Sequence, residues 1–183
     1  MNHKRYIIIT TTLSAAAAAA IFFVYGPSVR SVIYSAAAAV LAAIAVEDAL
    51  TKEIHDIFLW GLLLIAAADC FAAAFSGTGL WQHSAGPVER IAGAASLSVL
   101  MIVVNTVARH VSGRTGFGSG DVFLCIAAGS LLGLEKTLAA GAVSFIAAGL
   151  FAAVILISGR AKKDDSFALG PFLCMSFFIE LVV

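Results

Sequence analysis

Two aspartates at the borders of apolar segments are the residues of this sequence best suited to chemistry. Asp48 ends one apolar run, and Asp121 follows two alternating glycines in Gly118-Ser119-Gly120-Asp121. A carboxylate at a membrane boundary is costly, so it often marks a functional site. Two carboxylates held close together share a proton, which lets one act as a base and the other as an acid. The pair therefore predicts hydrolysis of a peptide bond inside or beside a bilayer.

The glycines before Asp121 extend the pattern to Gly116, Gly118 and Gly120, at alternate positions. Glycine permits positive φ and close backbone approach, so a substrate strand could lie directly against this loop. The alternative is a flexible turn in which Asp121 caps the helix that follows, where the helix dipole favours a negative charge. The sequence is compatible with both interpretations.

Further acids surround the first aspartate and form a predicted acidic rim of Glu47, Glu53 and Asp56. We expect this rim to attract a basic segment of a substrate through charge complementarity. Glu47 directly precedes Asp48, and the sequence alone does not decide which of the two belongs to the pair.

The composition places the chain in a bilayer. Hydrophobic residues make up 61% of the 183, charged residues 12%, and the mean hydropathy is +1.02. Basic and acidic residues balance at 11 each, so no basic patch indicates binding of nucleic acid. The three cysteines, Cys70, Cys125 and Cys174, lie in apolar runs without metal-ligand spacing, which predicts core residues and no metal site.

The apolar runs predict an all-α, polytopic membrane bundle of about seven transmembrane helices. A helix needs about 20 apolar residues to cross the hydrocarbon core. The runs near Asp48 and Asp121 are short, which would leave each carboxylate at the water boundary. The predicted spans are 6–25, 32–46, 57–75, 91–107, 122–134, 138–158 and 167–183.

The distribution of Lys and Arg predicts a cytoplasmic N-terminus and places both aspartates at the cytoplasmic face. In that orientation eight basic residues lie inside and three outside. The inside set is Lys4, Arg5, Lys52, Arg109, Arg114, Arg160, Lys162 and Lys163, and the outside set is Arg30, Arg90 and Lys136.

We predict a single membrane domain over residues 1–183, with an extra N-terminal anchor helix and loop at 1–31 and the core at 32–183. The first span could instead be a cleaved signal peptide, but its apolar run is long. It also ends in the bulky residues Phe22, Phe23 and Tyr25, where cleavage requires small ones.

Three ordered motifs resemble the type IV prepilin peptidase family. They are Asp48-Ala-Leu-Thr-Lys-Glu-Ile54, Gly118-Ser-Gly-Asp-Val122, and Leu169-Gly-Pro171-Phe-Leu173 at the start of the last span. The resemblance implies that Asp48 and Asp121 are the catalytic pair. Gly116, Gly118, Gly120, Glu47, Glu53 and Pro171 would then bind substrate or shape the site.

The same resemblance implies an aspartyl endopeptidase of the inner membrane, without metal or cofactor. It would remove the short basic leader of type IV prepilins and pseudopilins at the cytoplasmic face, a step in type IV pilus assembly and secretion. The resemblance leaves the particular substrate and the oligomeric state open. N-methyltransferase activity is not expected, because the chain lacks the cysteine-bearing cytoplasmic insertion of many bacterial members.

The sequence departs from the family pattern at two places near the predicted site. Ile54-His55-Asp56 replaces Ile-Pro-Asn, and Phe123 stands where a lysine is common. One alternative is therefore a catalytically inactive membrane assembly subunit. Another is an ion-coupled transporter that uses Asp69, Glu180 and Asp121, because ionisable residues inside a membrane are functional candidates.

Overall fold

The computed structural model describes residues 3–51, 54–75, 85–112, 118–159 and 168–183, and this part of the chain is helical with no strand. An all-α fold is confirmed. The described residues form seven helices: α1 His3–Tyr25, α2 Val29–Thr51, α3 Asp56–Phe75, α4 Pro87–Ser112, α5 Ser119–Leu132, α6 Leu134–Ile157 and α7 Gly170–Val182.

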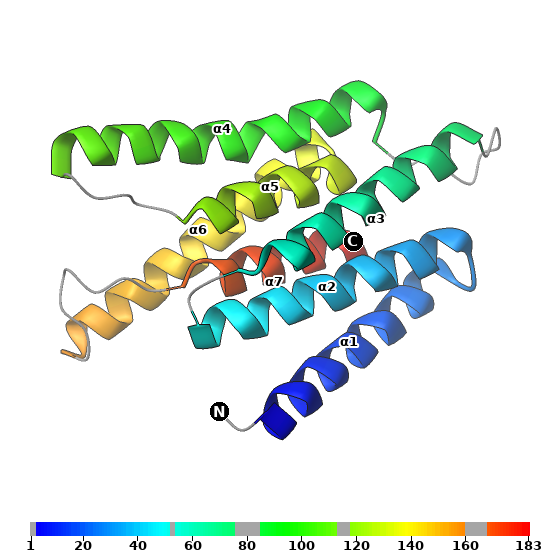
Figure 1. Ribbon diagram of the computed structural model, residues 1–183, viewed down its shortest axis with the longest axis horizontal. Helices are drawn as coiled ribbons and strands as arrows, with labels where there is room; N and C mark the ends of the chain where they lie inside the picture. Colours follow the sequence, from blue (N-terminus) through cyan, green and yellow to red (C-terminus); the bar gives the residue numbers. More distant parts are fainter. Residues whose placement is uncertain (1–2, 52–53, 76–84, 113–117, 160–167) are drawn as a thin grey trace.

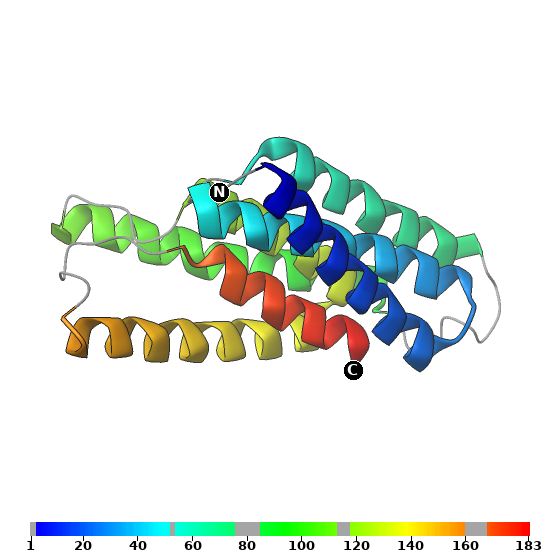
Figure 2. The same ribbon diagram turned by 90° about the horizontal axis from the view of Figure 1, so that it is seen from below.

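Successive helices run in alternating directions along one bundle (Figure 1). We call the end at which α2 ends and α3, α5 and α7 begin the site end. The helices α5 and α7 lie in the middle of the bundle, with α4 and α1 at opposite edges in the same view. The view from below shows that α7 lies between α6 and α2 (Figure 2), and it packs against both.

Five of the helices are long and apolar enough to cross a membrane, and α5 and α7 are shorter, with 14 and 13 residues. The short fifth segment was predicted. The second was predicted to be short as well, but α2 spans 23 residues and continues beyond Asp48. That prediction was wrong because hydropathy measures apolar content, and the polar stretch Glu47–Thr51 keeps a helical backbone.

The surface of the bundle is as apolar as its interior. Leu62, Met101 and Phe177 are completely buried, whereas Ile146 and Leu150 on α6 are exposed. A helix that is apolar on its inner and outer faces suits a lipid environment. The structure thus supports a multi-pass membrane protein.

Two glycines allow α4 and α5 to approach closely. A Cβ added at Gly93 would collide with the backbone of Gly129 and Gly133, and one at Gly129 would lie 2.5 Å from the carbonyl oxygen of Gly93. Gly133 itself has a φ of +83° and separates α5 from α6 as a single residue. Small residues at the crossing of two membrane helices let the backbones approach closely, which increases the packing contacts between the helices.

A buried ion pair joins three helices at the end opposite the site. The Arg90 guanidinium on α4 lies 2.5 Å from Asp69 Oδ2 on α3, and it also donates to the carbonyl oxygen of Ser130 on α5. Arg90 was expected in an external loop, but it lies inside α4 and is buried. Pairing allows both charges to be buried at a tolerable cost.

Candidate active site

Four helices surround the space between the two aspartates. α2 packs against α3 and α7, and α5 packs against the same two helices. Asp48 on α2 and Asp121 on α5 therefore lie on diagonally placed helices of this group. Only 5% of Asp48 and 8% of Asp121 is exposed, so both side chains point into the protein.

Asp121 lies in the first turn of α5, and its Oδ2 accepts a hydrogen bond from the backbone N–H of Gly118 at 3.2 Å. The predicted capping interaction is thus present. Glu89 makes the same contact in the first turn of α4, where the N–H of Gly86 donates to its Oε2 at 3.1 Å. Capping alone therefore does not distinguish Asp121 from a structural acid, and what distinguishes it is its neighbour.

That neighbour is Asp48, which is close enough to Asp121 for the two carboxylates to interact electrostatically. Cys174 on α7 is completely buried and lies within electrostatic range of both carboxylates. Cys125 on α5 is also buried, and its Sγ lies 3.7 Å from Met101 Sδ. The cysteines of α5 and α7 thus form part of the core beside the pair, as the sequence predicted. Cys70 on α3 is exposed, so the prediction of a core position was wrong for this residue.

Gly170 on α7 lies directly against the carboxylate of Asp48. A Cβ at Gly170 would lie 2.5 Å from Asp48 Oδ2 and 2.9 Å from its Cγ, so no other residue fits there without displacing the carboxylate. Asp48 Oδ2 is buried and has no hydrogen-bond partner among the described residues, although the Gly170 backbone faces the carboxylate. Pro171 follows in the first turn of α7, where its fixed φ suits a helix start.

The other residues predicted for the site lie in different places. Glu47 precedes Asp48 on α2, and its Oε1 lies 2.7 Å from His55 Nδ1. A Cβ at Gly120 would lie 3.1 Å from Ile54 Cβ, so this glycine lets the segment before α3 contact the start of α5. Gly116 and Glu53 lie outside the described residues.

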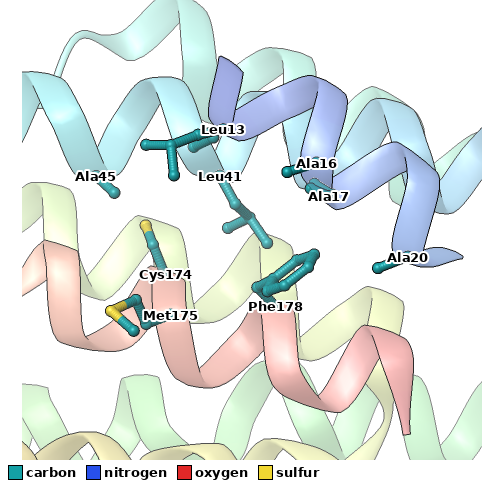
Figure 3. Close-up of a pocket in the computed structure, with 11 residues that line it drawn as sticks. Leu13, Ala16, Ala17, Ala20, Leu41, Ala45, Cys174, Met175 and Phe178 are labelled. Atoms are coloured by element: carbon teal, nitrogen blue, oxygen red, sulfur yellow. The ribbon is translucent and has the colours of Figure 1, made fainter. Parts of the chain in front are cut away.

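An apolar groove of about 250 Å³ runs beside the site, between α1, α2 and α7. Figure 3 shows Ala45 and Cys174 on one side of it and Ala16, Ala17 and Ala20 of α1 on the other. Ala45 lies one turn before Asp48, so the groove brings an apolar surface within one helical turn of the carboxylate.

Residues 35–157 match the model of the type IV leader peptidase family. The chain belongs to this family. The matched region contains both aspartates and more than half of the chain, whereas α1 and the motif at the start of α7 lie outside it. Searches of curated proteins and of solved structures gave no match. A type IV leader peptidase acts on a prepilin-type substrate, so the family implies a membrane-embedded peptidase with such a substrate.

Sequence reasoning missed the contributions of Gly170 and Ile54. Gly170 stands beside Pro171 in the third motif, so the motif itself carried a signal. The contact of Ile54 with Gly120 depends on how the segment before α3 meets α5, and no local pattern records it.

Proposed function

We propose that this leader peptidase is an aspartic endopeptidase whose catalytic groups are Asp48 and Asp121. The observation that carries the proposal is that two buried carboxylates from separate helices interact within the region that matches the family. Asp48 is preferred over Glu47, since Glu47 is paired with His55.

In the proposed reaction one aspartate, ionised, takes a proton from a water molecule while the other, protonated, donates a hydrogen bond to the scissile carbonyl. The water oxygen adds to the carbonyl carbon. The C–N bond then breaks, and the amine leaves with a proton supplied by the pair. The pair returns to its singly protonated state, and the chemistry requires neither metal nor cofactor. Two interacting carboxylates titrate as a unit, so the proposal assigns the proton to the pair and to neither residue alone.

We further propose that the site end faces the cytoplasm and that the protein resides in the inner membrane. Arg109 lies in the last turn of α4 at the site end, whereas Arg30, Arg90 and Lys136 lie near the opposite end. This distribution fits the positive-inside rule. Residues 1–31 would form an additional anchor helix and loop beside a peptidase core at 32–183, without methyltransferase activity.

The transporter interpretation loses its central acid in this structure. It required Asp69 as an ion-coupling group, and Asp69 is completely buried against Arg90. The interpretation as an inactive subunit predicts that no leader is cut. One cleavage assay therefore tests this interpretation together with the proposed endopeptidase activity.

The test is cleavage of a prepilin-type substrate by protein purified in detergent. We expect Asp48→Asn and Asp121→Asn each to lower kcat by about a hundredfold to ten-thousandfold, the range for loss of an acid or base. Glu89→Gln is the matched control because Glu89 occupies the equivalent position of α4 at the other end, and we expect wild-type cleavage. Full activity of either aspartate variant would refute the assignment, and absence of cleavage by the wild type on a panel of leaders would favour the inactive subunit.

A further inference from the structure

A second groove, of about 300 Å³, lies between α3 and α5 at the site end. It contains one carboxylate and two aromatic rings, from Asp56, Trp60 and Phe123, and the rest of its wall is aliphatic. Asp56 and Trp60 are four residues apart on α3, which places them on one face of that helix. Phe123 completes the groove from α5.

A carboxylate beside two aromatic rings is typical of a site that binds an organic cation. Trp60 is 66% exposed and Phe123 is 58% exposed, so their rings are accessible. A cation is attracted to the faces of such rings and to a carboxylate beside them. Asp56 lies in the first turn of α3 and forms no ion pair with any residue in the described ranges. Its charge therefore remains available to a ligand.

The structure distinguishes Asp56 from Glu47, another acid of the predicted rim. The carboxylate of Glu47 pairs with the imidazole of His55, and Glu47 Oε1 lies 2.7 Å from His55 Nδ1. Asp56 and Phe123 are two of the positions at which the sequence departs from the family pattern, and they line the same groove. With an acid and an aromatic ring at these positions, the groove favours a positively charged ligand.

We propose that this groove binds one lysine or arginine side chain of the substrate leader. The proposal rests on the proposed function, because it takes the ligand to be the basic leader of a prepilin-type substrate. An aliphatic stem would pack along the apolar wall formed by residues such as Leu63 and Ile126, and the charged group would lie between Asp56 and the rings.

The groove also determines where along the leader the cation lies. Asp121 is buried, and Phe123, two residues later, is exposed, so the two side chains lie on different faces of α5. A helix with its side chains is about 10 Å across. An extended chain covers that distance in about three residues. We therefore expect the recognised cation about three residues from the scissile bond.

The first experiment measures cleavage kinetics on two substrates that differ only in Lys or Gln at that position. We expect Asp56→Asn to raise KM for the Lys substrate about five- to tenfold, the effect of losing one cation contact at a partly exposed site, with kcat unchanged. The Gln substrate should be unaffected. Phe123→Lys should weaken the Lys substrate further by repulsion. Glu135→Gln, which neutralises an exposed acid in the first turn of α6 at the other end, is the matched control.

The second experiment measures binding, so it does not depend on cleavage. The chain has two tryptophans, and Trp81→Phe leaves Trp60 as the sole tryptophan, which can be excited selectively over the tyrosines. We expect a synthetic Lys leader peptide to change Trp60 fluorescence in the full-length protein, and the Gln peptide or the Asp56→Asn variant to give at least fivefold weaker binding.

The outcomes distinguish the two proposals. If the wild type binds the Lys peptide selectively but never cuts, the cation site stands and the endopeptidase proposal fails. If the wild type cuts Lys and Gln substrates equally and Asp56→Asn changes neither KM nor binding, the cation site is refuted and the endopeptidase proposal stands.

Discussion

The carboxylate of Asp48 is positioned by a steric contact at the residue scale. Helix α7 presents the Cα of Gly170 directly to this side chain, and a Cβ there would lie within 3 Å of two carboxylate atoms. In contrast, Asp121 is oriented by a hydrogen bond from Gly118. One aspartate is thus fixed by close packing and the other by a backbone donor, which gives the two acids of the pair different surroundings.

We therefore expect Gly170→Ala to impair cleavage by displacing Asp48. A displacement of about 1 Å in a catalytic group can cost on the order of a hundredfold in rate. Gly170 is not one of the glycines with a positive φ, so alanine is compatible with its φ and the folded state should persist. The measurement is kcat together with the melting temperature of the purified protein.

The control for this variant is Gly149→Ala on α6, because no atom lies within 4 Å of a Cβ at that position. It should cut at the wild-type rate. If Gly170→Ala also cuts normally, then Asp48 is not held by this contact, and if it melts far below wild type, its loss of activity says nothing about the carboxylate.

The two aspartates could be predicted from the sequence because their residue types and their borders with apolar runs are local properties. The sequence alone did not decide whether Glu47 or Asp48 belongs to the pair. Adjacent residues of a helix point about 100° apart, so Glu47 and Asp48 face different neighbours. Which one belongs to the pair depends on α7 and on His55, and neither is visible in the local sequence.

At the scale of the helices, the position of Asp121 depends on the crossing of α4 and α5. Gly93 and Gly129 bring the two backbones together, and Asp121 lies in the first turn of the same α5, eight residues before Gly129. Arg90 adds a second connection by joining Asp69 of α3 to the end of α5. The helix that carries the aspartate is thus fixed at the end away from the site.

We expect Gly93→Ala and Gly129→Ala to destabilise the protein by about 1–3 kcal/mol each, the usual cost of overpacking, because the clash is with backbone atoms that cannot rotate away. Gly141→Ala should cost less, since its Cβ would meet the flexible end of the Leu97 side chain. Reversible unfolding in SDS-containing mixed micelles measures these differences, with Gly149→Ala as the reference.

The decisive result is the order of these variants by their loss of unfolding free energy. Equal stability of Gly93→Ala and Gly149→Ala would show that α4 and α5 do not pack through the glycine contact. A larger loss for Gly141→Ala than for Gly129→Ala would show that side-chain packing outweighs the backbone approach.

The all-helical character of the described residues followed from hydropathy, whereas two features of the helices did not. The helix α2 continues through Glu47 and Asp48 because the residues after the apolar run have no glycine or proline to end it. Arg90 was assigned to the polar segment that precedes the predicted span 91–107. Its partner Asp69 is 21 residues away in the chain, and the packing of both α3 and α4 against α5 brings the two together.

At the scale of the whole molecule, the fold collects both candidate acids at one end of an alternating bundle. Seven helices in alternation place the end of α2 and the starts of α3, α5 and α7 together (Figure 1). That arrangement was predictable from the number of apolar segments between Asp48 and Asp121. The orientation of the bundle in the membrane rests on the charge bias, and it decides which compartment supplies the substrate.

We expect a cysteine at Val111 to be labelled by an impermeant maleimide only after cell lysis, and one at Val88 to be labelled in intact cells whose outer membrane is permeabilised. These residues lie near opposite ends of α4 and are similarly exposed, at 81% and 78%, so they form a matched pair. The background must lack Cys70, Cys125 and Cys174, which are all free thiols. Because Arg109 lies beside Val111, the positive-inside rule places that end in the cytoplasm. The reverse labelling pattern would place both aspartates on the outer side of the membrane, and the proposed cleavage of a leader at the cytoplasmic face would then be untenable.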